Sequence, residues 1–530
     1  MALTSRSLLK HGSALSLLTF LSRILGLLRE MTKARLLGTS ALSDAFSVAF
    51  MVPNLFRRLF AEGSISVAFI PTFKEYLLQK SKQEVREFLC CILTFLSFFV
   101  SLAVALGILA APLIINLFGL EEFNETVLLT RVMFPFLAFI SIAALFQGVL
   151  NSVNCFTPSG FAPILLNITA IVCAYALKDV AGNPARAMAA GILLGGFLEA
   201  AMQVPFVVKH GFTFFFTGLK KAVNHPGTKT VLKLVGPTII GMAAYQLNDL
   251  VSTALAGNAG EGVVSSLQYS LRLQELILGV FAVSIGTVLL PDLSEHAKSG
   301  NWDCYNDRLK SAMHIIAFIT IPITFFALAQ GESLIRLLFQ GRRFTETSVS
   351  LTKTAFTFHI PALLFIALNR ILAPAFYAQS DSKSPTIAGV ISFAVNMAFA
   401  AALVRPMRGA GVALALTIAS AINTILLLTF LKKNPLVNIN QTVWATFLYV
   451  LKMCCFSAAL MAPLLLFNPL LFELFARYNR FIHYGVPLVI TAALYFSAGL
   501  ALLVITKDEQ VYALLRVIRR KTAHSDAPNS

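Results

Sequence analysis

The chain is built from apolar blocks of about twenty residues or more that recur along almost its whole length, with short polar breaks between them. A helix of about 20 apolar residues crosses the roughly 30 Å hydrocarbon core of a bilayer. Apolar residues make up 57% of the 530 positions and charged residues 13%, whereas soluble domains average about 45–50% and about 25%. The pattern predicts an all-α polytopic membrane protein, and it excludes a soluble enzyme and a disordered scaffold.

The apolar blocks predict about fourteen transmembrane helices. Their approximate bounds are 12–37, 44–77, 88–118, 127–151, 160–178, 185–208, 229–257, 264–291, 309–330, 350–378, 385–404, 409–431, 443–467 and 482–506. The second block is too long for one straight span, so we expect it to kink or break at Pro53-Asn54 or at Glu62–Ser64.

Lysine and arginine are unevenly distributed between the polar loops on the two sides of the predicted membrane. With the N-terminus inside, 22 of them lie on the inner side and 9 on the outer side. Cytoplasmic loops carry this kind of excess, so both termini are predicted to be cytoplasmic. The same bias explains much of the net charge of +17, and nucleic acid is not predicted as a partner. Residues 507–523 carry five basic residues and are predicted to form an amphipathic helix on the inner leaflet.

An internal repeat of about 220 residues divides the chain. Residues 64–75 align without gaps on residues 284–295, and a weaker echo relates 156–158 to 383–385. An offset of six helices predicts two lobes in parallel pseudo-repeat, an architecture of transporters that bind substrate between the halves. The predicted parts are a six-helix lobe at 1–220, a six-helix lobe at 221–435, two additional helices within 436–506 and a basic cytoplasmic tail at 507–530.

Nine charged residues, six basic and three acidic, lie between positions 23 and 62. A charge at the centre of a membrane helix costs about 2.5–3.5 kcal/mol to insert, so these side chains are expected to face a hydrated cavity. The excess of positive charge predicts an anionic ligand, and arginine suits phosphate best. The predicted substrate-binding residues are Arg23, Arg29, Arg57, Arg58 and Arg272, with Glu30, Asp44, Glu62 and Glu275 as supporting charges. For Lys33 and Arg35, anchoring at the lipid head groups is an equally good interpretation.

Other motifs are weaker. Asn248, Asp249 and Asn396 are candidate ligands for a coupling cation, although hydrogen bonding between helices is the simpler explanation for the asparagines. The seven cysteines form no CxxC pair and are predicted to be free, mostly buried thiols, so no metal site is expected. The chain contains no P-loop, HExxH or GxSxG motif. We therefore predict no cofactor and no enzymatic activity, and coupling to a cation gradient or to the membrane potential is an open alternative.

Three segments carry a resemblance to a known family. They are SRILGLLREMTKARLLG at 22–38, SDAFSVAFMVPNLFRRLFAEGSISVAFIP at 43–71 and LAPAFYAQSDSKSP at 372–385. With these segments the chain resembles, along nearly its whole length, the MurJ (MviN) family of bacterial lipid II flippases in the MOP exporter superfamily. The resemblance implies fourteen helices, with two six-helix lobes and two C-terminal helices that form a groove for a polyprenyl tail.

The resemblance also implies a function and a site. The function is export of undecaprenyl-diphosphate-linked disaccharide-pentapeptide from the inner to the outer leaflet for peptidoglycan synthesis. The family's central cationic site falls on Arg23, Arg29, Asp44, Arg57, Arg58, Glu62 and Arg272. The chain departs from the family at Glu30, where Asp is frequent, and at Leu271, where an acidic residue is common. The Asp of a sodium site reported for some members falls near Ser252, one turn from Asp249.

The favoured hypothesis is a non-enzymatic, alternating-access lipid II flippase in the bacterial cytoplasmic (inner) membrane. The alternatives are an exporter of another polyprenyl-linked glycan and a multidrug exporter of the same fold, which for cationic drugs is expected to have an acidic cavity. A membrane scaffold does not explain buried arginines, and a membrane-bound transferase is expected to show a catalytic acid cluster. The expected partners are the lipid-linked diphosphate sugar, membrane lipids and cell-wall synthesis proteins.

Overall fold

The computed structural model describes residues 5–59 and 68–512, and for residues 5–16, 237–245 and 279–288 it describes the backbone alone. Within this part of the chain all the regular structure is helical. The described residues contain nine spans long and apolar enough to cross a membrane, one of which comprises two successive helices (Phe123–Ser152), and one bent pair of helices makes a tenth. The prediction of an all-α multi-pass membrane protein is confirmed, and the predicted count of fourteen spans is consistent with these helices.

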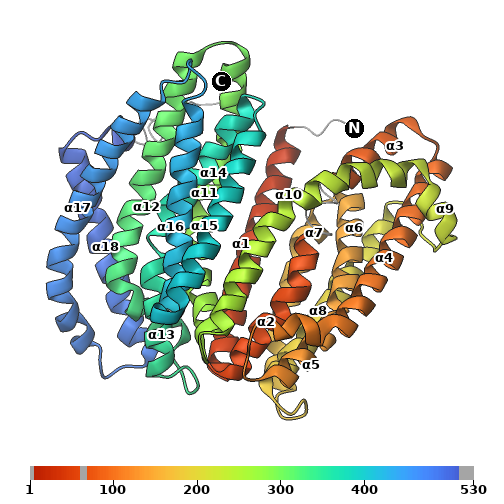
Figure 1. Cartoon of the computed structure of the whole chain (residues 1–530), viewed down its shortest axis with the longest axis horizontal. Helices are drawn as coiled ribbons and strands as arrows, with labels where there is room; N and C mark the ends of the chain where they lie inside the picture. The colour runs from red at the N-terminus through yellow and green to blue at the C-terminus, as the bar shows by residue number, and fades with distance from the viewer. Residues whose placement is uncertain (1–4, 60–67, 513–530) are drawn as a thin grey trace, which may run out of the picture. The chain divides into compact units, whose positions relative to one another are not determined.

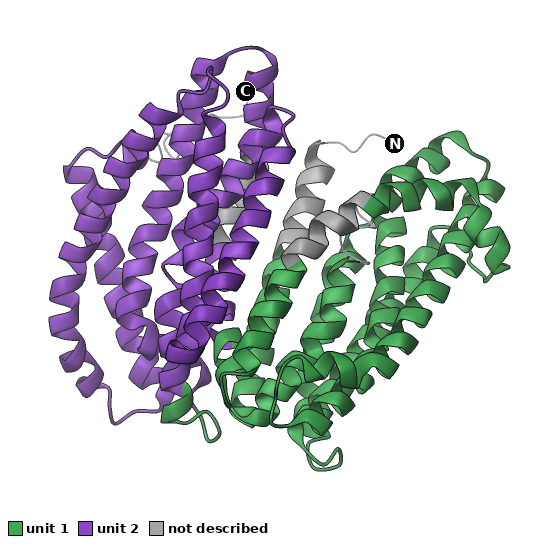
Figure 2. Ribbon diagram, viewed as in Figure 1, with its two compact units in different colours: residues 1–268, 341–348 green, residues 269–340, 349–530 purple. Residues whose placement is uncertain are grey.

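The chain forms two compact units (Figures 1 and 2). Unit 1 comprises residues 1–268 and 341–348. Its helices are α1 (Ser5–Leu37), α2 (Ala41–Arg57), α3 (Ile70–Gln79), α4 (Lys82–Asn116), α5 (Phe123–Met133), α6 (Phe136–Ser152), α7 (Thr157–Ala176), α8 (Pro184–Lys209), α9 (Leu219–Asn224), α10 (Pro226–Gly257) and the first turn of α11 (Val263–Lys298).

Unit 2 comprises residues 269–340 and 349–530. It contains the rest of α11 and, after it, α12 (Trp302–Phe339), most of α13 (Glu346–His359), α14 (Ala362–Ala378), α15 (Lys383–Met407), α16 (Gly409–Leu431), α17 (Ile439–Leu474) and α18 (Arg480–Ile505). The helices α17 and α18, predicted as an addition to the repeat, pack on each other and on α12.

Prolines break two of the apolar blocks that the sequence presents as continuous. The block predicted at 127–151 is two helices, α5 and α6, that meet at Phe134-Pro135. The block predicted at 350–378 is α13 and α14, which are bent by 44° at Ile360-Pro361. Proline has no N–H to donate and its ring clashes with the preceding turn, which explains both breaks.

Helix α2 runs without a break through Pro53-Asn54, the first of the two positions at which the long second block was expected to kink or break. Pro53 lies inside α2, and that helix continues to Arg57. The next described helix, α3, begins at Ile70, so the second predicted break, at Glu62–Ser64, lies outside the described residues. Most of the predicted amphipathic tail at 507–523 also lies outside them, since the description ends at 512.

The compact units divide the chain elsewhere than at the predicted lobe boundary of residue 220. Helix α10 follows that boundary, but it packs on α2, α3, α4 and α9 within unit 1. The unit therefore takes in one helix more than the sequence repeat assigns to the first lobe. The lobe boundaries themselves describe the repeat in sequence and stay a prediction.

Each unit has its own core. In unit 1 the rings of Phe69, Phe73 and Phe88 are fully buried, with centroids 5.1–6.2 Å apart, and His225 stacks on Phe88 at 5.6 Å. In unit 2 the side chains of Met461, Leu464 and Tyr495 join α17 and α18 to α12.

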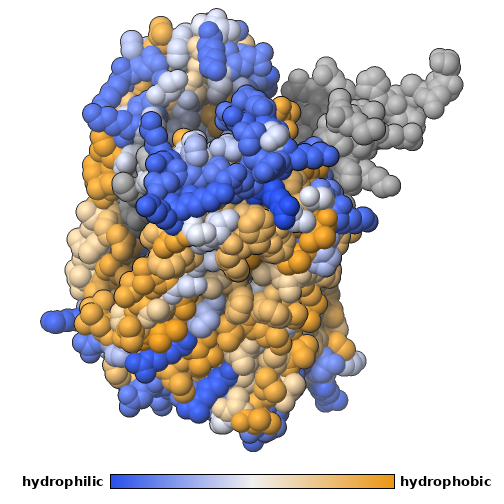
Figure 3. Space-filling view, turned by 90° about the vertical axis from the view of Figure 1, so that its right-hand side faces the viewer, coloured by the Kyte–Doolittle hydropathy of each residue, from blue (hydrophilic) through white to orange (hydrophobic). Residues whose placement is uncertain are grey.

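The outer surface of unit 1 suits a bilayer. On α4 the side chains of Leu102, Leu106, Leu109 and Leu113 lie four residues or fewer apart and are 45–75% exposed. Exposed leucines at helical spacing form a stripe that water would disfavour and lipid accepts. Figure 3 shows a broad apolar zone bounded by hydrophilic zones on the face that it displays. The chain is a multi-pass membrane protein.

Candidate substrate-binding site

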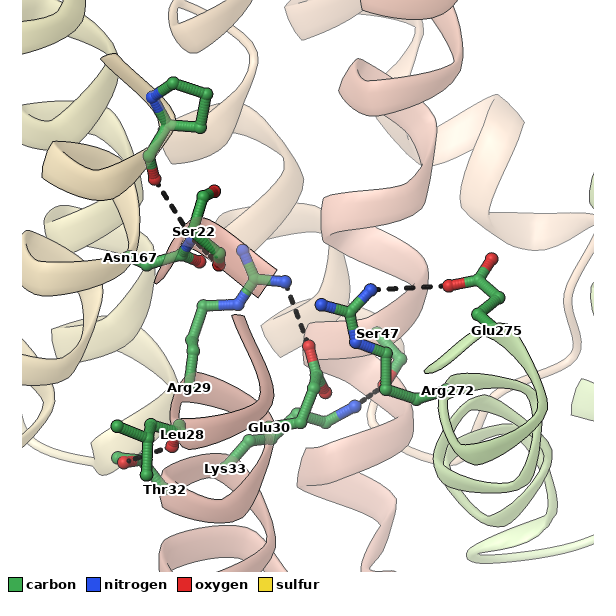
Figure 4. Close-up of polar contacts among 11 residues, drawn as sticks. Ser22, Leu28, Arg29, Glu30, Thr32, Lys33, Ser47, Asn167, Arg272 and Glu275 are labelled. Atoms are coloured by element: carbon green, nitrogen blue, oxygen red, sulfur yellow. Dashed lines mark hydrogen bonds and ion pairs between the residues drawn. The ribbon is translucent and has the colours of Figure 1, made fainter. Parts of the chain in front are cut away.

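The candidate site in unit 1 begins with Arg29 on α1. Its Nη2 donates to Oε1 of Glu30 at 2.9 Å, and both side chains are 16% exposed (Figure 4). The guanidinium carbon also lies 5.5 Å from the ring centroid of Phe50 on α2, in cation–π contact. The ion pair occupies one guanidinium nitrogen, and arginine has five N–H donors. Arg29 is therefore held by neighbours and keeps donors for a further anion.

The other predicted arginines of unit 1 are half-buried as well. Arg57 donates through Nε to Oδ1 of Asn54, one turn earlier on α2, at 2.8 Å. Arg58 is the C-cap of the same helix, and Arg23 lies nearly two turns before Arg29 on α1. The partner predicted for Arg58, Glu62, lies outside the described residues. Half-burial of so many guanidinium groups within the first two helices is costly in lipid and fits a hydrated surface.

Asp44 has a different partner from the arginines that the sequence suggested. Its Oδ2 accepts the backbone N–H of Gly262 and its Oδ1 accepts that of Ser265, both at 2.7 Å. These N–H groups belong to the start of α11, where unpaired donors and the helix dipole favour a negative charge. Asp44, 2% exposed, thus caps α11, and its role as a supporting charge stays a prediction.

Further bonds reinforce this junction. The backbone N–H of Ala41 donates to Oε1 of Glu261 at 2.9 Å, and Oγ1 of Thr39 bonds Oγ of Ser348 at 2.8 Å. Gly262 has φ +76° and lies so close to the Thr39 carbonyl that a Cβ would stand 2.4 Å from its oxygen. We name this set of contacts, from Thr39, Ala41 and Asp44 to Glu261, Gly262, Ser265 and Ser348, the α1–α2 clamp.

Lys33 lies between the arginines and this clamp. Its side chain is 4% exposed, and its Nζ donates to Oγ of Ser47 on α2 at 2.6 Å (Figure 4). The Ser47 hydroxyl in turn donates to the carbonyl of Ser43 at 2.7 Å. The interpretation of Lys33 as a head-group anchor does not fit this burial, whereas the exposed Arg35 is compatible with it.

The predicted site residues of unit 2 lie on α11. Arg272 donates from Nη1 to Oε2 of Glu275 at 3.3 Å, and its side chain is 27% exposed (Figure 4). Its Nε is buried and has no hydrogen-bond partner among the described residues. Buried N–H groups are nearly always hydrogen-bonded, so this donor is a candidate contact for a bound anion. Nearby on α11, Ser270 and Gln274 bond the side chain and the carbonyl of His359 at 2.7 and 2.6 Å, which fixes the helix at the α13–α14 bend.

The candidate cation ligands are distributed over two units. Asn248 and Asp249 are half-buried on α10 in unit 1, and Asn396 is 2% exposed on α15 in unit 2. The cation site remains a prediction for these three residues.

Sequence reasoning missed the side chains that hold the cations in place. Phe50, Asn54 and Ser47 position Arg29, Arg57 and Lys33, and they come from α2. A serine, an asparagine and a phenylalanine in an apolar helix give no signal of their own. Only the i, i+3 spacing of Asn54 and Arg57 was readable from the sequence.

Comparison with known proteins now bears on what this site does. A sequence profile described as lipid II flippase MurJ matches residues 33–482. The chain is 44% identical over 519 residues to the probable lipid II flippase MurJ of Treponema pallidum, which covers 97% of this chain and 98% of that protein. It is 32% identical over 423 residues to the lipid II flippase MurJ of Burkholderia cenocepacia, covering 78% and 82% of the two chains.

Solved structures show the same similarity at the level of the fold. A structure of lipid II flippase MurJ in an inward closed conformation superposes with a TM-score of 0.75 at 27% identity, over 92% of this chain and 98% of the other. An inward-facing multidrug-resistance MATE transporter of the MOP superfamily superposes with a TM-score of 0.68 at 14% identity, over 79% and 96%, which shows a shared fold alone. The resemblance found in the sequence is confirmed: this chain belongs to the lipid II flippase MurJ family.

Proposed function

We propose that this protein moves lipid II, the undecaprenyl-diphosphate disaccharide-pentapeptide, from the inner to the outer leaflet of a bacterial cytoplasmic membrane. The observation that carries the proposal is the similarity to lipid II flippases along 97% of the chain. The family is one of transporters, and the proposed cycle contains no chemical step.

The arginines are proposed to bind the diphosphate. Arg29, Arg57 and Arg58 in unit 1 and Arg272 in unit 2 are half-buried, and Arg29 and Arg272 each have a carboxylate neighbour that orients the guanidinium. Charge-assisted hydrogen bonds from arginine to phosphate are about twice as strong as neutral ones and can be bidentate. The Nε of Arg272, which has no hydrogen-bond partner in the part of the chain that the structure describes, is a donor that a phosphate oxygen would satisfy.

Alternating access is proposed to depend on the α1–α2 clamp. Helix α11 begins in unit 1, where Asp44 caps it, and continues into unit 2. We propose that the cap on α11 breaks when the membrane side at which the clamp lies opens. A ligand drives such a change only if it binds one state more tightly than the other. Diphosphate binding supplies this difference because it neutralises arginines that otherwise repel one another.

The proposed orientation places both termini in the cytoplasm, as the distribution of lysine and arginine predicts. The clamp would then lie at the outer face. The polyprenyl tail is proposed to run along α17 and α18, which carry exposed apolar side chains such as Leu466, Leu470 and Val489. A membrane potential or a cation gradient is proposed to bias the return of the empty carrier, and cell-wall synthesis proteins are proposed as partners.

A multidrug exporter of the same fold is disfavoured by the sign of the charge. Export of a cationic drug needs acidic side chains in the binding region, and here α1 and α2 carry a basic excess. An exporter of another polyprenyl-linked glycan would use the same arginines, so only the cargo separates it from a lipid II flippase.

Depletion of the protein in its native bacterium tests the cargo. Lipid-linked precursors are extracted as the protein disappears, and each species is measured by mass spectrometry. The proposal predicts that lipid II accumulates at least several-fold while other polyprenyl-linked glycans stay constant. Accumulation of a different polyprenyl-linked glycan with constant lipid II would contradict it. Re-expression of the wild-type chain should reverse the accumulation, and a chain with Arg29→Ala should not.

A further inference from the structure

Lys33 is a buried cation that diphosphate binding by the arginines leaves unexplained. It lies one turn after Arg29 on α1, with a side chain that is only 4% exposed. Arg35, two residues later, is exposed. A buried ammonium is stable only when it is hydrogen-bonded and its charge is compensated. The groups that compensate Lys33 therefore indicate what it does.

Those groups belong to both the arginine site and the clamp. Lys33 donates to Ser47 on α2, and Asp44 lies one turn before Ser47 on the same helix. Glu30 lies one turn before Lys33 on α1, so the hydrogen bond from Lys33 to Ser47 has one carboxylate a turn away on each of the two helices. Glu30 is paired with Arg29 at 2.9 Å, and Asp44 caps α11. The hydrogen bond from Lys33 to Ser47 thus joins a position one turn from the carboxylate that holds Arg29 to a position one turn from the carboxylate that caps α11.

We propose that Lys33 is a positioning residue that couples occupancy of Arg29 to the α1–α2 clamp. This inference rests on the proposed function, in which Arg29 binds the diphosphate. A diphosphate that draws Arg29 away from Glu30 leaves the Glu30 carboxylate to be compensated by Lys33. Lys33 then compensates Asp44 less, the buried carboxylate becomes costlier, and the cap on α11 opens more often. When the site is empty, Arg29 returns to Glu30 and the clamp tightens.

A reporter cysteine inside the junction measures clamp opening. Ser266 is 1% exposed, and its hydroxyl donates to the Val263 carbonyl in the first turn of α11. Ser266→Cys is introduced into the full-length chain with the native cysteines replaced. This protein, the reference protein, is placed in lipid nanodiscs. The rate of reaction with a water-soluble maleimide is recorded with and without lipid II, and lipid II binding is measured on the same samples.

Lipid II is expected to raise the labelling rate of the reference protein at least about fivefold, within the usual range of coupling between sites. Lys33→Met keeps the length and removes the charge. It is expected to raise the rate without lipid II by a similar factor, to abolish the response to lipid II, and to change the affinity for lipid II less than about threefold. Lys33→Arg should restore part of the response, and the exposed control Arg35→Met should behave as the reference does. A response that persists in Lys33→Met, or is absent from a reference protein that binds lipid II, would overturn the proposal.

A second part of the experiment measures labelling without lipid II. Labelling rates of Lys33→Met, Asp44→Asn and the double variant form a cycle that isolates the interaction between the two residues. The double variant is expected to label no faster than Asp44→Asn alone, since Lys33 acts through Asp44. Additive effects would overturn the link between Lys33 and the clamp whatever the cargo is. Failure of lipid II to bind the reference protein would instead overturn the proposed function, and with it the coupling to substrate.

Discussion

At the scale of single residues, the proposed binding of the diphosphate depends on half-buried guanidinium groups. Arg29 and Arg272 each pair with one nearby carboxylate on their own helix, at 2.9 and 3.3 Å. A neighbouring carboxylate of this kind orients the side chain without using all of its donors. The same carboxylates, Glu30 and Glu275, are then available to compensate the arginines when the anion has left.

Replacement of either arginine tests this role. Arg29→Ala or Arg272→Ala should abolish lipid II export while membrane insertion stays normal, because the transported diphosphate loses its charge-assisted donors. Lysine at either position should support partial export, since it restores the charge but not the planar fork. Complementation of a depleted strain measures export, and the protein level in membranes measures insertion. Arg35→Ala, an exposed site on the same helix as Arg29, serves as the matched control and should complement fully.

Replacement of Asp44 is expected to lower the stability of the protein as well as to impair transport. Asp44→Asn keeps the shape but offers an NH₂ group to one of the two backbone N–H donors that the carboxylate now satisfies. An unsatisfied buried donor costs about 1–3 kcal/mol, so the variant should unfold at lower temperature in detergent. Glu261→Gln, which keeps an acceptor for the Ala41 N–H at an exposed site, should change the midpoint much less. Equal midpoints for Asp44→Asn and the wild type would mean that the cap contributes nothing to this state.

At the scale of secondary-structure elements, close packing of helices depends on glycine. A Cβ on Gly191 of α8 would stand 2.8 Å from the Cα of Ala170 and from the carbonyl oxygen of Thr169 on α7. Small residues let membrane helices approach this closely, and the gain there comes from packing rather than from exclusion of water. The pair α7 and α8 therefore cannot accept a side chain at this point without moving apart.

Gly191→Ala should destabilise the protein by about 1–3 kcal/mol, the usual cost of overpacking. Gly389→Ala on α15 is the control, because a Cβ there would meet no atom within 4 Å. It should be neutral or slightly stabilising, since alanine is the better helix former by about 1 kcal/mol. Thermal unfolding of both variants in one detergent compares them directly, and equal loss in both would contradict the packing argument.

Much of the element order could be predicted from the sequence, because helices that cross a bilayer must be long and apolar. The all-α class and most helix positions follow from blocks of about twenty apolar residues. The breaks at Pro135 and Pro361 were not predicted, since the apolar blocks run through them without a polar residue to mark an end. The arginines could be selected as candidates because charge is rare in such helices.

The contacts of those charges could not be read in the same way. Asp44 and Gly262 are 218 positions apart, and Lys33 meets Ser47 on a different helix. Such pairs depend on how helices rotate and pack, which the apolar pattern specifies only loosely. The sequence thus suggested Asp44 as a counter-charge for the arginines. It did not indicate that the carboxylate of Asp44 accepts hydrogen bonds from backbone N–H groups at the start of α11.

At the scale of the whole molecule, the orientation in the membrane makes a separate prediction. Residues 121–125 and 257–262 should face the outside, and residues 209–233 and 432–439 should face the cytoplasm. Single cysteines at positions 121 and 221, both exposed, should differ in intact cells. A membrane-impermeant reagent should label position 121 at once and position 221 only after the cells are permeabilised. Labelling of position 221 in intact cells would reverse the orientation and place the clamp on the cytoplasmic side.

Transfer of lipid II between the leaflets is proposed to depend on the arginines of this chain. The most direct measurement is the fraction of lipid II that an externally added, membrane-impermeant cleaving enzyme can reach in cells whose own copy has been depleted. Re-expression of the wild-type chain should return most lipid II to the accessible pool within minutes, whereas equal amounts of Arg29→Ala or Arg272→Ala should leave it protected. Full accessibility with both alanine variants, or continued protection with the wild-type chain correctly inserted, would contradict the account.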